Sequence, residues 1–180
     1  MSLQSTATLE NPALTLADLV KIATPIGARL TQRGERIAVA ESTTGGLLAA
    51  ALLAVPGASA YFAGGVVIYT QISRRELLGV HQTDVAGQMP LTIGMAAVFA
   101  DAVRHRLQAH WGIGELGLAG PGPGRYGKPA GTTVVAITGA TSAGSEWVSG
   151  HDDRERNMWA FATHALLTLA AALHDPVEPA

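Results

Sequence analysis

Four short apolar segments without polar–apolar alternation are the feature that most constrains how this chain can fold. They span residues 36–40, 64–69, 113–119 and 132–138; helical segments separate the first three, and a Gly/Pro loop separates the last two. Strands that lack alternation are buried on both faces, which is typical of a parallel sheet covered by helices. We therefore predict an α/β fold, a three-layer α/β/α sandwich around a largely parallel (mixed) sheet.

Helix signals surround these strands. Thr15 is a plausible N-cap for a helix that runs to about Arg33, and Gly34 is a plausible stop. Pro25 lies inside that helix and should kink it or split it in two. We also expect helices over residues 47–55, 73–78, 93–107 and 154–172, the last capped by Asp152 or Asp153, and a short edge strand over residues 147–149.

The length of 180 residues corresponds to about one domain. We predict a single domain over residues 1–180, with a core over residues 36–173 and an N-terminal helix over residues 15–33. Residues 1–12 and 175–180 are expected to be frayed tails.

Charge and composition exclude several classes of function. Twelve basic and 14 acidic residues give a net charge of −2, which offers no electrostatic case for binding nucleic acid or an anionic membrane. The apolar stretch over residues 47–55 is about half the length that crosses a bilayer, and residues 1–15 resemble no signal peptide. The absence of cysteine excludes a disulfide framework, a thiolate zinc site and a cysteine nucleophile, and it is compatible with a cytoplasmic protein. The six histidines show no metal-ligand spacing, so no metal is expected.

The Gly/Pro loop over residues 120–129 contains two misleading motifs. Its glycines match G-x-G-x-x-G, but a strand rather than a helix is expected after them. It also matches G-x-x-x-x-G-K, but Pro129 follows where a phosphate loop needs a hydroxyl. Two interpretations stay open: a flexible connection between strands, or a nest of backbone N–H groups for an anion beside Arg125 and Lys128.

The segment Glu41–Gly46, which joins a strand to a helix, is more informative. Ser42 or Thr44 is either an N-cap or a nucleophile presented at the edge of the sheet. In the second interpretation, the N–H groups of Gly45 and Gly46 could stabilise an oxyanion. No histidine lies nearby in the sequence to act as a base. Asp152 and Asp153 are more simply a helix cap than a catalytic pair.

Several motifs in a fixed order resemble the CinA C-terminal family. They are Ala40-Glu-Ser-Thr-Thr-Gly-Gly46, Val55-Pro-Gly-Ala-Ser59, Gly65-Val-Val-Ile-Tyr-Thr70, Glu76-Leu-Leu-Gly-Val80, Leu118-Ala-Gly-Pro-Gly122, Lys128-Pro-Ala-Gly-Thr132 and Asp153-Arg-Glu155. The resemblance covers about residues 36–173. It implies an α/β/α sandwich and nicotinamide mononucleotide deamidase activity, which occurs in the family in a stand-alone domain or one fused to a molybdopterin-binding-like domain. At 180 residues, this chain looks like the stand-alone form.

The resemblance also implies roles for individual residues. Ser42 would be the nucleophile that attacks the nicotinamide carboxamide, Tyr69 would contact Ser42 or the substrate, and Arg74 occupies the position of a catalytic lysine. The substrate-binding positions implied are Glu41, Thr44, Gly45, Gly46, Gly120, Pro121, Gly122 and Arg154. We expect Glu41–Gly46, Tyr69, Arg74 and Gly120–Gly122 to converge on one small-molecule nucleotide substrate. No metal or organic cofactor is implied, and we expect a cytoplasmic homo-oligomer.

This chain departs from the family pattern at four positions that match the site. Gln71 and Arg74 replace the asparagine and lysine of the family's Tyr-Ser-Asn-x-x-Lys segment, Leu116 replaces a threonine, and Met158 replaces an arginine. Guanidinium stays charged where a desolvated lysine can lose its proton, so Arg74 would be a poor general base. Two functions therefore stay open: an amidohydrolase of the nicotinamide mononucleotide type with weak activity or a shifted substrate choice, or an impaired relative that binds a nucleotide or a partner. A third interpretation leaves Ser42 as a helix cap.

Overall fold

The computed structural model describes residues 14–174, so both predicted tails lie outside the described residues. A five-stranded sheet has the order β2-β1-β3-β4-β5. The strands are β1 (Ile37–Glu41), β2 (Phe62–Val67), β3 (Trp111–Leu118), β4 (Thr132–Thr138) and β5 (Ala143–Val148). β1 pairs in parallel with β2 and β3, whereas β4 pairs antiparallel with β3 and β5. Four of the five strands therefore point the same way, which confirms the mixed sheet.

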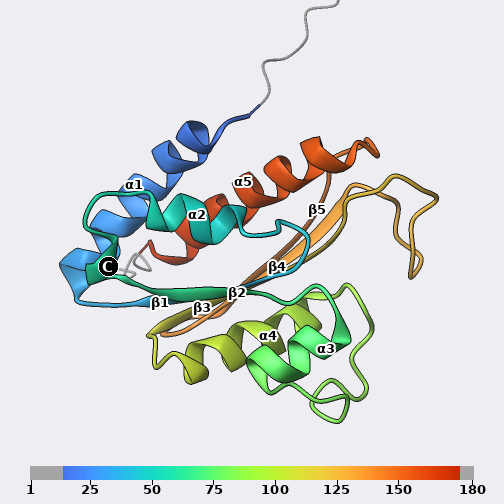
Figure 1. The fold of residues 1–180 in the computed structure, drawn as a ribbon, viewed down its shortest axis with the longest axis horizontal. Coiled ribbons are helices and arrows are strands. Elements are labelled where there is room, and N and C mark those ends of the chain that lie inside the picture. The colour runs from blue at the N-terminus through green and yellow to red at the C-terminus, as the bar shows by residue number, and fades with distance from the viewer. Residues whose placement is uncertain (1–13, 175–180) are drawn as a thin grey trace, which may run out of the picture.

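Helices cover both faces of this sheet, as Figure 1 shows. α1 (Leu16–Arg33), α2 (Leu47–Leu53) and α5 (Arg154–Ala172) lie on one face. α4 (Ile93–Arg106) and α3 (Gln71–Ser73), which continues into a π-helical turn over Arg74–Leu78, lie on the other, and a 3-10 turn over Ala58–Ala60 precedes β2. Each face has its own hydrophobic core. The predicted α/β/α sandwich is therefore confirmed.

Some of the predicted boundaries differ from those in the structure. β2 begins at Phe62, two residues before the predicted start at Gly64, and ends at Val67 rather than at Tyr69. β5 is six residues long, where a short strand over residues 147–149 was expected. Pro25 was predicted to kink the first helix or split it in two; the split is wrong, because α1 runs unbroken from Leu16 to Arg33. Pro25 and the residue one turn before it, Lys21, face solvent, so water can satisfy the carbonyl that loses its partner.

Two glycines of β3 allow α4 to pack directly on the sheet. A Cβ atom at Gly112 would lie 2.1 Å from the Ala100 carbonyl oxygen, and one at Gly114 would lie 2.1 Å from the Ala96 carbonyl oxygen. A backbone in a packed helix has little room to retreat, so these positions require glycine. The close packing fixes β3 between the helical layers.

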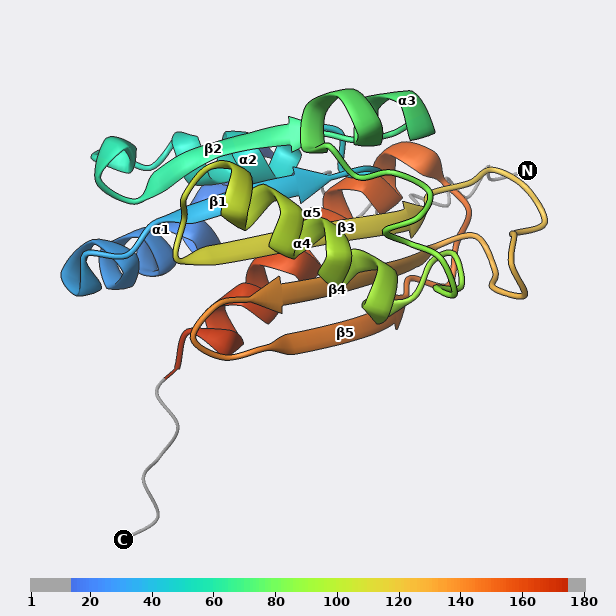
Figure 2. The ribbon, with the colours of Figure 1, turned by 90° about the horizontal axis from the view of Figure 1, so that it is seen from below.

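The sheet places the loops of interest along one edge. The parallel strands β1, β2 and β3 all end there, and the loop between β3 and β4 extends from the same edge (Figure 2). Ligand sites in open α/β sheets form at the carboxyl ends of parallel strands. Within residues 14–174, no helix combines the length and the hydropathy that a membrane span requires.

Candidate functional site

The loop that follows β1 carries the predicted nucleophile. Ser42 is 7% exposed, and its backbone N–H donates to Glu115 Oε2 at 3.1 Å. Its hydroxyl has no hydrogen-bond partner in the described part of the chain. Ser42 therefore does not cap α2, whose N-cap residue is Gly46 and has no side chain to offer. The Ser42 hydroxyl therefore lies unpaired on a strand-to-helix turn, and its role as a nucleophile stays a prediction.

Two buried carboxylates support this loop from beneath. Glu41 of β1 accepts hydrogen bonds from the backbone N–H groups of Leu48 and Ala49, both at 3.1 Å, and thus caps the first turn of α2. Glu115 of β3, its register partner, is also fully buried. The Thr44 hydroxyl lies 2.7 Å from Glu41 Oε2 and 3.1 Å from Glu115 Oε2. The side chains of Glu41 and Thr44 are thus engaged in the interior, so any effect that they have on a substrate passes through the loop.

The Gly45 and Gly46 amides differ from the rest of this loop. Their N–H groups have no acceptor in the part of the chain that the structure describes. Both glycines have positive φ angles, 63° and 106°, which side-chain-bearing residues rarely adopt. Because they have no acceptor among the described residues, the two N–H groups are available as donors to a bound oxygen atom.

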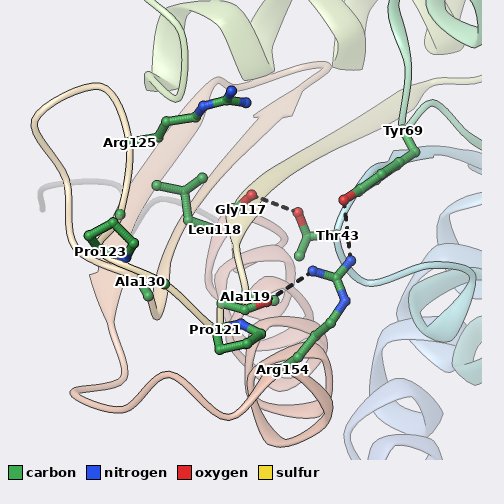
Figure 3. Close-up of a pocket in the computed structure, with 13 residues that line it drawn as sticks. Thr43, Tyr69, Gly117, Leu118, Ala119, Pro121, Pro123, Arg125, Ala130 and Arg154 are labelled. Carbon is green, nitrogen blue, oxygen red and sulfur yellow. Dashed lines mark hydrogen bonds between the residues drawn. The ribbon is translucent and has the colours of Figure 1, made fainter.

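A cavity of about 230 Å³ opens beside this loop at the end of the sheet (Figure 3). Arg154 links two of its walls: it donates to the Tyr69 hydroxyl at 3.3 Å and to the Gly120 carbonyl at 3.2 Å. Thr43, the neighbour of Ser42, also lines it and donates to the Gly117 carbonyl at 2.9 Å. The residues around this cavity are Thr43, Tyr69, Gly117, Leu118, Ala119, Gly120, Pro121, Gly122, Pro123, Gly124, Arg125, Ala130 and Arg154.

A second cavity of about 360 Å³ adjoins the first and contains Arg74. The two cavities share Tyr69, Gly117, Leu118 and Arg125 as lining residues, whereas Gln71, Arg74 and Leu116 line the second but not the first.

Arg74 has an unusual environment for an arginine. Its guanidinium lies 5.0 Å from the centroid of the Phe99 ring, and its Nε donates to the Ile68 carbonyl at 3.5 Å. No carboxylate pairs with it among residues 14–174. Burial lowers the pKa of Arg74, and the nearby Tyr126 hydroxyl opposes that shift. The second cavity thus holds an arginine that is not neutralised by an acidic residue.

The structure brings only some of the predicted site residues into direct contact. Tyr69, Arg154 and Gly120–Gly122 meet at the first cavity, next to the loop that carries Ser42. Arg74 lies in the adjoining cavity instead. Met158, which replaces the family's arginine, lies against Gly45: a Cβ atom there would be 3.1 Å from the Met158 methyl carbon. The catalytic and binding roles of these residues stay predictions.

Sequence reasoning missed two residues that shape this site, Glu115 and Asn157, and did not single out Thr43 within the segment Glu41–Gly46. Glu115 binds the loop backbone, and Thr43, rather than Ser42, lines the cavity wall. Asn157, fully buried near the start of α5, donates to the Ala119 carbonyl at 2.9 Å and to the His151 carbonyl at 3.0 Å. A charged residue inside an apolar segment is the signal that marks Glu115, whereas Asn157 directly follows three charged residues, Arg154 to Arg156, and carries no such signal.

The two basic residues of the Gly/Pro loop, Arg125 and Lys128, have different surroundings. Lys128 forms an ion pair with Glu146 of β5, at 2.5 Å, whereas Arg125 lines both cavities. Strand β4 follows the loop, in agreement with the rejection of a dinucleotide motif. Within residues 14–174, no group of three or more histidine, aspartate or glutamate side chains is placed to hold a metal ion.

Fold and site together define an α/β/α sandwich protein with a cavity at the carboxyl ends of its parallel strands, where open α/β sheets form ligand sites. More particularly, the chain belongs to the CinA family: the model of the CinA C-terminal domain matches residues 19–173. A CinA-like protein of Anaeromyxobacter sp. (strain K) is 41% identical over 145 residues, which are 79% of this chain and 36% of that protein. A CinA-like protein of Synechocystis is 40% identical over 138 residues, 77% of this chain and 33% of that protein. The chain thus spans about a third of the length of these curated relatives.

Solved structures of similar size share the fold. The competence damage-inducible protein A of Klebsiella pneumoniae has a TM-score of 0.79 and 28% identity, and the match covers 86% of this chain and 96% of that one. A competence/damage inducible protein of Agrobacterium tumefaciens has a TM-score of 0.78 and 29% identity, covering 95% and 98% of the two chains.

Proposed function

We propose that this protein is an amidohydrolase that converts nicotinamide mononucleotide to nicotinate mononucleotide and ammonia, with Ser42 as the nucleophile. The unpaired Ser42 hydroxyl, on a turn beside a cavity that Tyr69, Arg154 and the Gly120 loop enclose, is the observation that carries this proposal. Membership of the CinA family supports it.

The proposed reaction has two stages. Ser42 Oγ attacks the carboxamide carbon, its proton passes to the leaving nitrogen, and the C–N bond breaks to release ammonia. Water then attacks the acyl-serine ester, and the carboxylic acid product leaves as Ser42 regains its proton. The free N–H groups of Gly45 and Gly46 would stabilise the oxyanion formed in each stage.

The general base of this mechanism is the group that the replacement of lysine by Arg74 affects. Arg74 stands where relatives of this type use lysine, and a guanidinium remains protonated even where burial lowers its pKa. Since a positioned general base contributes about 10²–10⁴-fold to a rate, we propose slow turnover. Arg74 and Arg125 line the same cavity and would favour an anionic group such as the phosphate of the substrate.

The alternative proposal is a protein that binds a nucleotide without turning it over. The replacement of the lysine by Arg74 and of the threonine by Leu116, both in the second cavity, favours it. These substitutions remove a potential base and a hydroxyl but leave the first cavity with its Tyr69–Arg154 contact.

Ammonia release separates the two proposals. Purified protein is incubated with nicotinamide mononucleotide, and ammonia is measured alongside the Kd from calorimetry, with Ser42→Ala as the control. Slow release that the control abolishes supports the amidohydrolase. Binding without release by the wild-type protein supports the alternative, and the absence of both rejects the nucleotide as a ligand.

A further inference from the structure

The carboxylate of Glu115 binds the loop that carries Ser42 through an unusual set of contacts. Its Oε2 atom accepts hydrogen bonds from the backbone N–H groups of three consecutive residues: Ser42 at 3.1 Å, Thr43 at 2.9 Å and Thr44 at 3.1 Å. Consecutive N–H groups that converge on one oxygen form an anion-binding concavity. In this protein the anion is supplied by the chain itself, from a residue about 70 positions away.

The hydroxyl of Thr44 connects Glu115 to a second buried carboxylate. It lies within hydrogen-bond distance of Glu41 Oε2, at 2.7 Å, and of Glu115 Oε2, at 3.1 Å. One hydroxyl has one proton to donate, so it cannot donate to both carboxylates at once. When Glu115 is ionised, the three backbone N–H groups share its charge and the Thr44 hydroxyl can donate to Glu41; when Glu115 is protonated, it can itself donate to the Thr44 hydroxyl oxygen.

The surroundings of Glu115 raise its affinity for a proton. Burial is the main cause that raises the pKa of Glu115 to about 7, and the charge of Glu41 on β1 adds to it, while the hydrogen bonds from the loop oppose the shift. From β4, the Thr133 hydroxyl lies 3.5 Å from Glu115 Oε1. From α5, the apolar Phe161 ring packs on the same side of β3. Glu41 is thus the charged group that faces Glu115 within the described residues.

We propose that Glu115 is a positioning residue for the reaction proposed above, and that its ionised carboxylate holds the Ser42–Thr44 backbone in the reactive geometry. The inference rests on the proposed function only for its effect on turnover. Glu115 does not contact the Ser42 hydroxyl, so it acts through the backbone and not as the base. Protonation removes the charge that three N–H groups share, and the loop loses the restraint that orients Ser42.

The first experiment follows the backbone amides by ¹⁵N NMR from pH 5 to 9 without ligand. We expect the Ser42, Thr43 and Thr44 signals to shift together with one midpoint near neutrality, and Glu115→Gln to abolish that common titration. Glu41→Gln is the matched control: it removes the neighbouring charge, so the midpoint should fall while the three signals still titrate together. Three amides that do not share a midpoint in the wild-type protein overturn the proposal, whether or not the variants fold.

The second experiment measures ammonia release over the same pH range. We expect wild-type kcat to rise with the midpoint seen by NMR, and Glu115→Gln to lower kcat about 10- to 100-fold, with KM within a few-fold and no such rise. If kcat does not change with pH around the midpoint of the amide titration, Glu115 is not a positioning residue. If the protein shows no turnover but the three amides still titrate together, the proposed function is rejected. The binding of the Ser42–Thr44 backbone by the Glu115 carboxylate is then still supported by the NMR result.

Discussion

Replacing Arg74 with lysine should raise the rate at which the protein releases ammonia from nicotinamide mononucleotide. Burial without a carboxylate partner in residues 14–174 disfavours the positive charge of Arg74, whereas the face of the Phe99 ring, 5.0 Å away, attracts it. A lysine there meets the same desolvation, but its unperturbed pKa is about 10.4, against about 12.5 or more for arginine. At any given pH, its neutral fraction is therefore at least about 100-fold larger.

Only part of that gain reaches the rate, because most of the lysine stays protonated near pH 8. Since a positioned base contributes about 10²–10⁴-fold, we expect Arg74→Lys to raise kcat about 10-fold or more, with a pH profile that climbs as the lysine loses its proton. Leu116→Thr, in the same cavity, should raise it further. Arg74→Gln is the control that removes the charge without supplying a base, and it should bring no gain. Robust wild-type turnover that Arg74→Lys abolishes would refute the argument.

Three further predictions test the site and the fold. Ser42→Ala should abolish turnover and leave the Kd for the nucleotide within a few-fold; unchanged turnover would remove the nucleophile assignment. Between pH 5 and 8, the free energy of unfolding of the wild-type protein should fall by up to about 3 kcal/mol relative to that of Glu115→Gln. The pKa of Glu115 is about 7 in the folded state and 4.5 in the unfolded state, so the folded state binds the proton more tightly and loses that advantage as the pH rises. Denaturation curves that give the same difference between the two proteins at every pH would contradict this. Gly114→Ala should cost several kcal/mol, because its Cβ would lie 2.1 Å from the Ala96 carbonyl, whereas Gly94→Ala meets only the flexible end of a side chain and should melt within a few degrees of the wild type.

The fold could be predicted from the sequence because its signals are local. Non-alternating apolar runs marked the central strands, and Thr15 and Gly34 marked the ends of α1. β5 was underestimated because it is a half-exposed edge strand, rich in small and polar residues, which is stabilised by pairing with β4. The stacking of Trp147 on His164 of α5, with ring centroids 5.5 Å apart, adds a contact that no local pattern contains.

The site was harder to predict because it depends on contacts through space. The motif around Ser42 could be recognised along the chain, but Glu115 lies inside a predicted buried strand, where nothing nearby shows what its carboxylate contacts. Its partners are defined only when β1 and β3 pair in parallel and place Glu41 opposite Glu115. The same reason explains why Arg74 was expected around one substrate pocket but lies in an adjoining cavity.

Neighbouring residues of β3 contribute to two different halves of this site. Because side chains alternate along a strand, Glu115 reaches the Ser42 loop on the side of α5, whereas Leu116 packs in the core on the side of α4 and lines the cavity of Arg74. Three of the four departures from the family pattern, Gln71, Arg74 and Leu116, therefore gather in one cavity, on the opposite side of the sheet from the carboxylates that hold the loop. A substitution confined to that cavity changes the side chains that could accept a proton there. The hydrogen bonds that Glu41 and Glu115 accept from the loop that carries Ser42 stay unchanged. Arg74→Lys therefore leaves the loop with its serine unchanged, and it tests whether a lysine in that cavity can accept the Ser42 proton, directly or through one water.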